Sequence, residues 1–307
     1  MPELEIRPYE SRDSQAAASL MRDSFPQPSA ITPAAVEHWI SSSPERSETR
    51  AWVAYEGDRL VGWADAQLRW SIVEEGITEV WVAVRRNHRG SGIGRRLYTL
   101  AESHVLGVGA RRIETFARED EPESIAFAER RGFSETRRER MWALDLSAVE
   151  AQAPRVPDGF RVVRLAEVRP QERELFELYE AAHADMPSDH THALVFEEWV
   201  RETLENPELD LEMSSVVLAG DRPAAFAWLT SDRETRRASH EMTGTHPDFR
   251  QRGLARVAKE AAIQWAVEAD LEYLITSNDG TNEAMLGLNE RLGYEPRTPL
   301  IELAKTV

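Results

Sequence analysis

Hydrophobic and polar residues alternate in several short runs of the first 150 residues. Such alternation is typical of strands, because successive side chains of a strand point to opposite faces. The predicted strands are residues 4–8, 51–55, 60–68, 77–84, 112–117 and 141–146. Elsewhere the apolar residues recur every three or four positions, as on one face of a helix. The predicted helices are residues 14–21, 33–40, 92–107 and 124–131.

The remaining residues repeat this order of elements. The predicted strands are residues 160–164, 214–219, 224–230, 238–245, 273–277 and 300–303. The predicted helices are residues 171–182, 196–204, 254–269 and 282–292. Each half therefore contains one strand, two helices, three strands, and then alternating helix and strand. This order predicts a mixed α/β fold for each half.

A direct repeat relates the two halves at a constant offset. Residues 89–94 (RGSGIG) return in altered form as residues 250–255 (RQRGLA), 161 positions later. A motif repeated at a fixed distance indicates one structural unit that occurs twice. We therefore predict two tandem domains, residues 1–150 and residues 160–307. A linker of residues 151–159 joins them.

Composition narrows the class of protein. The chain has 307 residues, 41% of them hydrophobic, which is enough for two ordinary cores. It has no cysteine, so disulfides, thiolate metal sites and cysteine nucleophiles are excluded. No apolar run approaches 18 residues, and the first residues do not resemble a secretion signal. These features predict a soluble cytoplasmic protein that does not enter a membrane.

The net charge is −17, which makes nucleic acid an unfavourable partner because its binding requires clustered cations. Acidic surface near a pocket would favour a cationic substrate such as an amine. Solubility alone is the other explanation of the charge, and the sequence gives it more weight.

The repeated glycine segments each precede a predicted helix. Glycine has no Cβ, so backbone N–H groups can approach a ligand closely, and a helix start adds unpaired N–H groups and partial positive charge. Such a loop suits a diphosphate. A tight strand-to-helix turn with solvated arginines is the alternative explanation. Neither copy has the lysine of a P-loop or the spacing of the dinucleotide fingerprint.

The residues around both loops resemble the acetyl-CoA loop of the GNAT superfamily of N-acetyltransferases. In the first copy Val82-Ala83-Val84 precedes Arg89-x-x-Gly92-x-Gly94. In the second copy Thr243-Gly244-Thr245 precedes Arg250-x-x-Gly253-x-Ala255. The asparagine-rich run from Asn278 through Asn282 and Asn289 to Tyr294 is also similar to that superfamily. The resemblance covers nearly the whole chain and implies two tandem GNAT domains.

The resemblance implies acetyl-CoA (CoA) as the cofactor. The strand before each loop would bind the pantetheine arm, the loop the diphosphate, and Asn282 the pantetheine. In the second half the implied cofactor residues are Thr243, Gly244, Thr245, Arg250, Gln251, Arg252, Gly253, Leu254, Ala255, Arg256, Asn278 and Asn282. In the first half they are Val82, Ala83, Val84, Arg89, Gly90, Ser91, Gly92, Ile93, Gly94 and Arg95. Glu121 stands where the second half has Asn282, and its charge disfavours an anionic cofactor.

Acetyl transfer to an amine requires a neutral amine and a proton for the leaving thiolate. Glu241 and Glu79, on the strands before the loops, are the candidate bases, one residue out of register with each other; a charge at the solvent end of the strand is the alternative explanation for each. A bulge can cause such an offset. The family's tyrosine acid is replaced by Asn289 in the second half and by Ala128 in the first, so the acid is unassigned. Asn289 either donates a hydrogen bond in the active site or packs as an amide.

The acceptor pocket of this fold is usually shaped by the connection between the first two helices. In the second half this is residues 185–192, where Asp185 and Asp189 are candidates for pairing with a cationic substrate. His190 and His192 lack a third ligand, so we predict no metal site.

The leading hypothesis from sequence is an acetyl-CoA-dependent N-acetyltransferase. It would act on a primary amine of a small molecule or peptide, with catalysis mainly in the second half and a mainly structural first half. A non-catalytic acyl-CoA binder or sensor is the alternative, and a purely structural protein the third possibility. Two tandem copies are consistent with a monomer, and a homodimer remains open.

Overall fold

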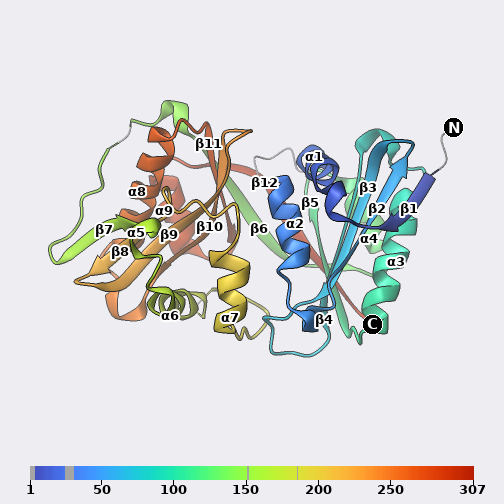
Figure 1. Ribbon diagram of the computed structural model, residues 1–307, viewed down its shortest axis with the longest axis horizontal. Helices are drawn as coiled ribbons and strands as arrows, with labels where there is room; N and C mark the ends of the chain where they lie inside the picture. The colour runs from blue at the N-terminus through green and yellow to red at the C-terminus, as the bar shows by residue number, and fades with distance from the viewer. Residues whose placement is uncertain (1–3, 25–30, 151, 185) are drawn as a thin grey trace.

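The structure is a computed structural model that describes residues 4–24, 31–150, 152–184 and 186–307 (Figure 1). Ala151 of the predicted linker and Asp185 of the predicted acceptor loop lie outside the described residues.

The elements of the first half follow the predicted order. Its strands are β1 (Leu4–Pro8), β2 (Arg50–Glu56), β3 (Arg59–Leu68), β4 (Ile77–Val84), β5 (Arg112–Arg118) and β6 (Ser134–Asp145). Its α-helices are α1 (Ser14–Ser24), α2 (Pro33–Ser41), α3 (Ile93–Gly107) and α4 (Pro122–Glu129). The start of α2 is fixed by Thr32, whose side chain accepts a hydrogen bond from the Ala35 N–H (3.1 Å).

The second half repeats these elements and adds a short helix that the sequence did not predict. Its strands are β7 (Phe160–Arg164), β8 (Ser215–Ala219), β9 (Arg222–Asp232), β10 (Arg237–Thr245), β11 (Tyr273–Asp279) and β12 (Glu295–Thr306). Its helices are the added α5 (Leu165–Val168), α6 (Glu172–His183), α7 (Phe196–Trp199), α8 (Leu254–Glu268) and α9 (Glu283–Arg291). The turn after α7, Val200–Leu204, is π-helical rather than α-helical.

The described strands form a twelve-stranded sheet in the order β1-β2-β3-β4-β5-β12-β6-β11-β10-β9-β8-β7. The two halves exchange their last strands within it. Antiparallel pairing joins β12 to β5 of the first half, from Leu300↔Arg118 to Thr306↔Arg112. In return, β6 pairs with β11 of the second half. The sequence predicted both strands but not their exchange, and the division at residues 150 and 160 stays a prediction.

Helices cover both faces of the sheet, with the same arrangement in each half. On one face α3 and α8 pack in separate hydrophobic clusters, α3 against residues such as Val80 and Ile113, and α8 against Ala225 and Leu274. On the other face α1 and α2 pack near Trp63 and Ala83, and α6 and α7 near Phe226 and Trp228. The strand order is symmetric about the β12–β6 pair, so the halves are related by an approximate two-fold axis through it.

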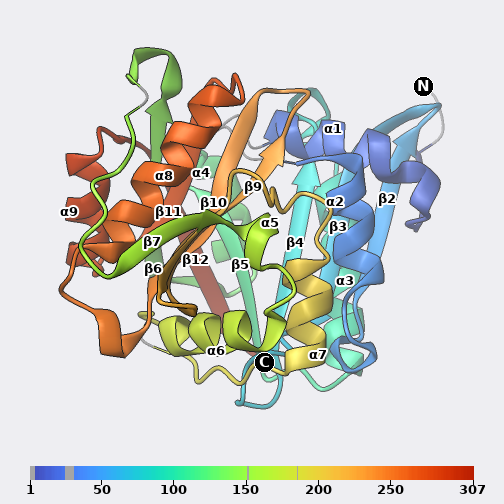
Figure 2. The same cartoon turned by 60° about the vertical axis from the view of Figure 1, so that its left-hand side comes forward.

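The helices on this second face meet across the boundary between the halves. Figures 1 and 2 show α2 and α7 side by side, and His38 of α2 lies 3.2 Å from the Glu202 carbonyl oxygen. Arg22 at the end of α1 bonds the buried carboxylate of Asp232 at 2.8 Å. The two halves therefore form one continuous structure through both the sheet and the helical layer.

Candidate functional site

In each half, two neighbouring parallel strands separate after three residue pairs. Residues 77–79 of β4 pair with residues 112–114 of β5, and beyond them the strands diverge. Residues 237–239 of β10 and 273–275 of β11 behave in the same way. Diverging strands leave backbone groups without sheet partners, which makes the opening a natural place for a ligand.

A cavity of about 960 Å³ occupies the opening in the first half. Its walls include Val80 and Ala117, which belong to the cluster under α3. They also include Trp81 and Ala83, which pack on the opposite face, under α1 and α2. Residues that pack on both faces of the sheet therefore border the cavity at the opening between β4 and β5. Its volume is in the range of small-molecule and cofactor sites.

The glycine loop forms the end of this cavity on the α3 side. Gly90 and Gly92 adopt left-handed φ values of 77° and 88°, and Gly92 is the N-cap of α3. A Cβ at Gly90 would meet no atom within 4 Å, so packing does not explain this glycine. The backbone conformation does, because it presents N–H groups at the helix start. Arg89 and Arg95 lie in the same wall and add positive charge.

Most of the first-half residues predicted to hold the cofactor line this cavity. They are Val82, Ala83, Val84, Arg89, Gly90, Ser91, Gly92, Gly94 and Arg95. Ile93 does not line it, because its side chain is 4% exposed and packs in the core under α3.

Glu121, whose charge counted against cofactor binding in the first half, is paired in the structure. It is the N-cap residue of α4, and its carboxylate accepts hydrogen bonds from Arg89 (3.0 Å) and Ser124 (3.0 Å). Arg86 adds a longer ion pair of 3.6 Å. These cations offset the charge that an anionic ligand would meet.

The second-half loop retains the backbone shape of the first. Gly253 is the N-cap of α8 with φ of 75°, and Gln251 holds a φ of 60° at the position of Gly90. A left-handed conformation costs a side-chain-bearing residue about 1 kcal/mol or more. Gly244 has a different reason to be glycine, because a Cβ there would lie 2.4 Å from the Ala182 Cβ of α6.

Beside this loop, buried polar side chains occupy the opening between β10 and β11. Lys259 of α8 and Asn289 of α9 are both 0% exposed. Lys259 Nζ donates a 2.9 Å hydrogen bond to Asn289 Oδ1, and Asn289 Nδ2 donates one of 2.6 Å to Asn278 Oδ1. The predicted cofactor residue Asn278 and the predicted catalytic residue Asn289 are thus bonded within the protein. Asn282, a further predicted cofactor residue, caps α9 by accepting from the Met285 N–H (3.2 Å).

Aromatic and imidazole groups complete this network. Lys259 Nζ lies 4.9 Å from the ring centroid of Tyr294, and His240 Nε2 lies 2.8 Å from the Tyr294 hydroxyl. Burial lowers the pKa of Lys259 to about 7. Burial, with a smaller effect of the Lys259 charge, lowers the pKa of His240 well below its usual value. Both shifts are typical of groups removed from water.

The residues 161 positions earlier explain why the first half is open. Tyr98 corresponds to Lys259, Ala128 to Asn289 and Ala117 to Asn278. The two alanines leave space where the second half has amides, and all three first-half residues line the cavity. The cavity therefore lies in the half that was predicted to be mainly structural, and which half is catalytic stays a prediction.

The two candidate bases lie in different surroundings. Glu241 is the extra residue of a β-bulge between His240 and Met242 and has no register partner on β9, whereas Glu79 pairs with Gln67 of β3. Its side chain is exposed, although surrounding protein raises the pKa of its carboxyl by desolvation. Glu79 is half-buried and directly precedes the cavity residues Val80 and Trp81. Burial raises the pKa of Glu79, Arg69 lowers it, and Glu114 raises it further.

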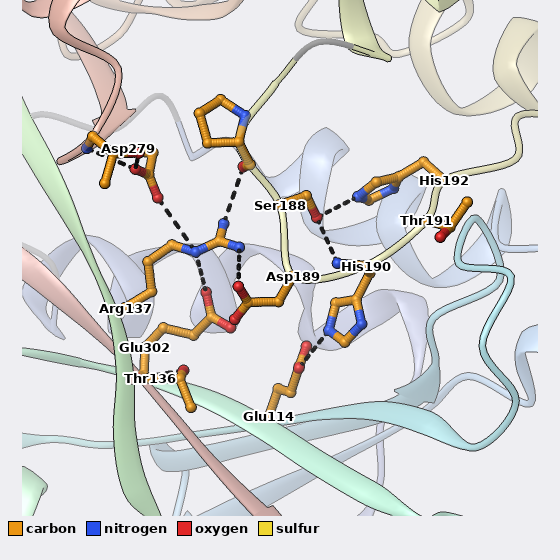
Figure 3. A network of polar contacts seen from close by, with 12 residues as sticks. Glu114, Thr136, Arg137, Ser188, Asp189, His190, Thr191, His192, Asp279 and Glu302 are labelled. Carbon is orange, nitrogen blue, oxygen red and sulfur yellow. Dashed lines mark hydrogen bonds and ion pairs between the residues drawn. The ribbon is translucent and has the colours of Figure 1, made fainter.

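The predicted acceptor loop of the second half docks on the first half (Figure 3). His190 Nε2 lies 2.7 Å from Oε1 of Glu114, a β5 residue with no exposed surface. The Thr191 carbonyl accepts from the Val73 N–H (2.9 Å), and the Ala193 N–H donates to the Ser71 carbonyl (2.8 Å). The loop therefore covers the first half near β5, on the face of α1 and α2.

Arg137 of β6 joins carboxylates from several elements beside this loop (Figure 3). Its guanidinium lies 3.3 Å from Asp279, 3.6 Å from Asp189 and 3.9 Å from Glu302. Asp189, predicted to pair with a cationic substrate, thus contacts an arginine of the first half. No group of three or more histidine or acidic residues in the described ranges is arranged to hold a metal ion.

Sequence reasoning missed three residues of these sites. Asp65 of β3 shares the α1 face with Glu79, and a simple strand alternation would have placed it there. Tyr98 lines the cavity from α3. Lys259 is one of two lysines in the chain, and this rarity was its signal, because its position lies off the apolar face of Leu254, Ala258 and Ala261 in the predicted helix.

Comparison with known proteins identifies the family. The model of the acetyltransferase (GNAT) family matches residues 14–133 and 173–294, so the chain belongs to this family and contains it twice. GNAT proteins typically bind acetyl-CoA and act on amines. No curated protein matches the chain.

Solved structures share the fold over the whole chain. A tandem GNAT protein from the clavulanic acid biosynthesis pathway has a TM-score of 0.76 and 19% identity, covering 99% of this chain and 98% of its own. A GCN5-related N-acetyltransferase from Sphaerobacter thermophilus has a TM-score of 0.72 and 17% identity, with coverage of 99% and 95%. At these identities the likeness concerns the fold. Within the described ranges no helix has the length and apolar character needed to span a bilayer.

Proposed function

We propose that the protein is an acetyl-CoA-dependent N-acetyltransferase that acetylates a primary amine of a small molecule or peptide at the first-half cavity. The observation that carries this proposal is the set of residues that line the cavity. These residues extend from the glycine loop on the α3 face to Trp81 on the α1 face. A cofactor and an acceptor amine can therefore meet in the opening between β4 and β5 from opposite sides of the sheet.

The residues of the cavity fit the parts of the cofactor. The N–H groups at Gly90 and Gly92, with Arg89 and Arg95, suit the diphosphate. Residues 82–84 of β4 pair with β3 but have no partner on β5, so the β5 side of this strand suits the amide-containing pantetheine arm. Acetyl-CoA would supply the acetyl group as a thioester, activated for attack by an amine. In the second half, Lys259 and Asn289 occupy the corresponding space, so its predicted cofactor residues fit the group poorly.

Proton transfer would involve carboxylates that neighbour the cavity residues Val80 and Trp81 on the α1 face. Glu79 is the sequence-predicted candidate for receiving the amine proton. The thiolate has no tyrosine acid at the family position, where Ala128 stands. Tyr98 also lines the cavity, but its hydroxyl donates to Glu102 Oε1 (2.9 Å). We expect the leaving thiolate to take its proton from the attacking amine or from water.

The second half would then support the first. It contributes β12 beside β5 and the loop with His190 above Glu114. Glu241 is exposed on a strand whose cofactor opening is filled, so we assign it no catalytic role. We expect folding to require the whole chain, because β5 loses its long antiparallel partner β12 when the second half is removed and keeps only three pairs with β4.

The direct test combines calorimetry with thiol detection. We expect acetyl-CoA to bind with a stoichiometry near one per chain, and at least one amine of a broad panel to release free CoA. Binding without amine-dependent release would instead support the acyl-CoA sensor. Absence of binding at saturating acetyl-CoA would overturn both. A stoichiometry near two would contradict the assignment to one half.

A further inference from the structure

A second carboxylate stands beside Glu79 on the face of α1 and α2. Asp65 of β3 is the antiparallel partner of Trp81, and Gln67 is the partner of Glu79. Asp65 is therefore diagonal to Glu79 on the same face, within about 7–8 Å between backbones. Trp81 belongs to the cavity wall, so Asp65 stands next to the end of the cavity where an amine would enter.

The Asp65 carboxylate is fixed by the strand to which it belongs. Trp63 Nε1 donates a hydrogen bond of 2.6 Å to Asp65 Oδ2, and the Trp63 ring is 0% exposed. The ring of Tyr9 packs against that of Trp63 edge-on at 5.2 Å and limits its movement. Asp65 itself remains half-buried, so water or a small substrate can reach it. A fixed, accessible carboxylate is suited to proton transfer.

Few charged groups shift the pKa of Asp65. Its neighbours on β2 and β4 are Ala51 and Trp81, which carry no charge. Desolvation raises the pKa of Asp65 to about 7, the Trp63 hydrogen bond opposes this, and the Glu79 charge adds to it. The pKa of Glu79, raised by burial, is in turn lowered by the charge of Arg69 and raised by that of Glu114.

Tyr9 is the other titratable group packed near Trp63. Its hydroxyl lies 2.6 Å from Ser14 Oγ. Besides burial, the charges of Glu37 on α2 and of Asp13 raise the pKa of Tyr9. Neither of these carboxylates shifts the pKa of Asp65. That pKa is set by burial, by the Trp63 hydrogen bond and by the Glu79 charge.

We propose that Asp65 is the proton acceptor for the amine in the first-half reaction, and that Glu79 is a positioning residue that sets its proton affinity. This inference rests on the proposed acetyltransferase function. The assignment differs from the sequence-based one, which considered Glu79 and Glu241 as bases. It follows from the fixed hydrogen bond to Trp63 and from the position of Asp65 beside the cavity residue Trp81.

The proposed step conserves atoms and charge. One N–H bond of the substrate ammonium breaks, and the proton passes to Asp65 directly or through one water. The neutral amine then forms a C–N bond with the acetyl carbon while the C–S bond breaks. A second N–H proton leaves the nitrogen and ends on the thiol sulfur. Asp65 releases its proton to solvent through its exposed part, so the products are the amide, CoA and one proton.

The test uses two isosteric variants of the full chain, Asp65→Asn and Glu79→Gln, with Asp58→Asn at the exposed β2–β3 turn as control. Substrate is any amine that the wild-type enzyme acetylates. For Asp65→Asn we expect kcat/KM to fall about 100-fold or more and the acidic limb of its pH profile to disappear. For Glu79→Gln we expect the limb to persist and move to lower pH, because a like charge is lost. The reciprocal pattern, with the limb lost only in Glu79→Gln, overturns the assignment.

Two measurements separate this inference from the proposed function and from misfolding. Acetyl-CoA affinity, measured by calorimetry, should be unchanged in Asp65→Asn, whereas turnover of no amine by the wild type would contradict the function itself. Infrared spectra of the cofactor-free protein should show a carboxylic acid band that titrates near pH 7 and is missing in Asp65→Asn. Should Asp65→Asn not fold, Trp63→Phe replaces it, and its acidic limb should move to higher pH. A limb unmoved in Trp63→Phe overturns the proposal.

Discussion

Lys259 and Asn289 form a fully buried hydrogen bond of 2.9 Å that joins α8 to α9 across the opening between β10 and β11. The same two positions in the first half hold Tyr98 and Ala128, and there the opening remains a cavity. One fold thus occurs twice in the chain, with a cavity in one copy and a polar network in the other. This difference is the basis for assigning distinct functions to the two halves.

The two helix-capping glycines give the sharpest test of that difference. Gly92 and Gly253 have the same left-handed conformation, and a Cβ at either would meet no backbone atom within 4 Å. Glutamate at either position should therefore cost similar folding energy. We expect Gly92→Glu to weaken acetyl-CoA binding at least 100-fold, because a carboxylate would face the diphosphate. Gly253→Glu should bind within a few-fold of wild type, as measured by calorimetry.

Thermal melting of both variants serves as the control, and their Tm values should agree within a few degrees. The opposite pattern, with binding lost in Gly253→Glu and kept in Gly92→Glu, would return the cofactor site to the second half. That result would support the sequence-based prediction over the cavity geometry.

Lys259 should make stability depend on pH. Its pKa is about 7 in the folded protein and near 10.5 when unfolded, so between these values the unfolded chain binds a proton that the folded chain lacks. Stability should rise with pH across this window, and below pH 7 the full penalty remains. Lys259→Met removes the titrating group. We expect it to be more stable than wild type at pH 7, on the order of 1–3 kcal/mol after the loss of the Asn289 hydrogen bond.

Urea unfolding at pH 7 and pH 9.5 tests this expectation. The free energy of unfolding should increase with pH more in the wild type than in Lys259→Met. Equal slopes would mean that Lys259 is charged in the folded state and that the polar network is more hydrated than its burial indicates. Such a result would also weaken the conclusion that Lys259 and Asn289 fill the opening between β10 and β11.

Much of the local structure could be predicted from sequence. Strand β4 was placed at its observed ends, and the starts of α3 and α8 were given by Gly92 and Gly253. The start of α2 is local in the same way, since Thr32 caps the helix with its own side chain and Pro33 follows it. These features depend on residues close in sequence, because alternation, capping and left-handed glycines are local properties.

The exchange of β6 and β12 and the filled opening could not be predicted. The residues of a strand indicate that the segment is extended and which of its faces is apolar. They do not indicate which half of the chain provides the strand that pairs with it. The space beside Asn289 is decided by Lys259, 30 positions away, on another helix. The motif that resembles the GNAT superfamily is stronger in the second half, although the cavity lies in the first. A sequence motif indicates the local backbone conformation of the fold. Whether a cavity for a ligand exists depends on side chains from several elements.

Arg137 should be essential for the junction of the halves. Arg137→Met would leave Asp279 and Glu302 close together without their shared cation, and Glu302 is 5% exposed. Removing one partner of a buried charge network typically costs about 3–5 kcal/mol. Burial makes the largest contribution to raising the pKa of Glu302, and the Glu114 charge raises it further. The loss should therefore be larger at pH 7.5 than at pH 5, because a raised pKa makes Glu302 take up its proton earlier as the pH falls, and that protonation relieves the repulsion.

Chemical unfolding of Arg137→Met at both pH values measures the effect. Arg138→Met is the matched control, since Arg138 is half-exposed and its partners Glu119 and Glu135 are on the surface. The control should lose no more than about 1 kcal/mol. Equal losses in the two variants would show that the Arg137 network contributes no more than a surface ion pair.

Gly244 separates a packing requirement from cofactor contact. A Cβ at this position would lie 2.4 Å from the Ala182 Cβ and 2.8 Å from Phe226, whereas the first half has Ala83 at the same position. Gly244→Ala should destabilise the protein by about 1–3 kcal/mol through overpacking and leave acetyl-CoA binding unchanged. Ala182→Gly alone should cost about 1 kcal/mol, as glycine does inside a helix. The double variant should be more stable than the sum of the single losses predicts, because removing the Ala182 methyl relieves the closest contact. Additive losses, or weaker cofactor binding in Gly244→Ala alone, would show that this glycine serves a ligand rather than the contact with α6.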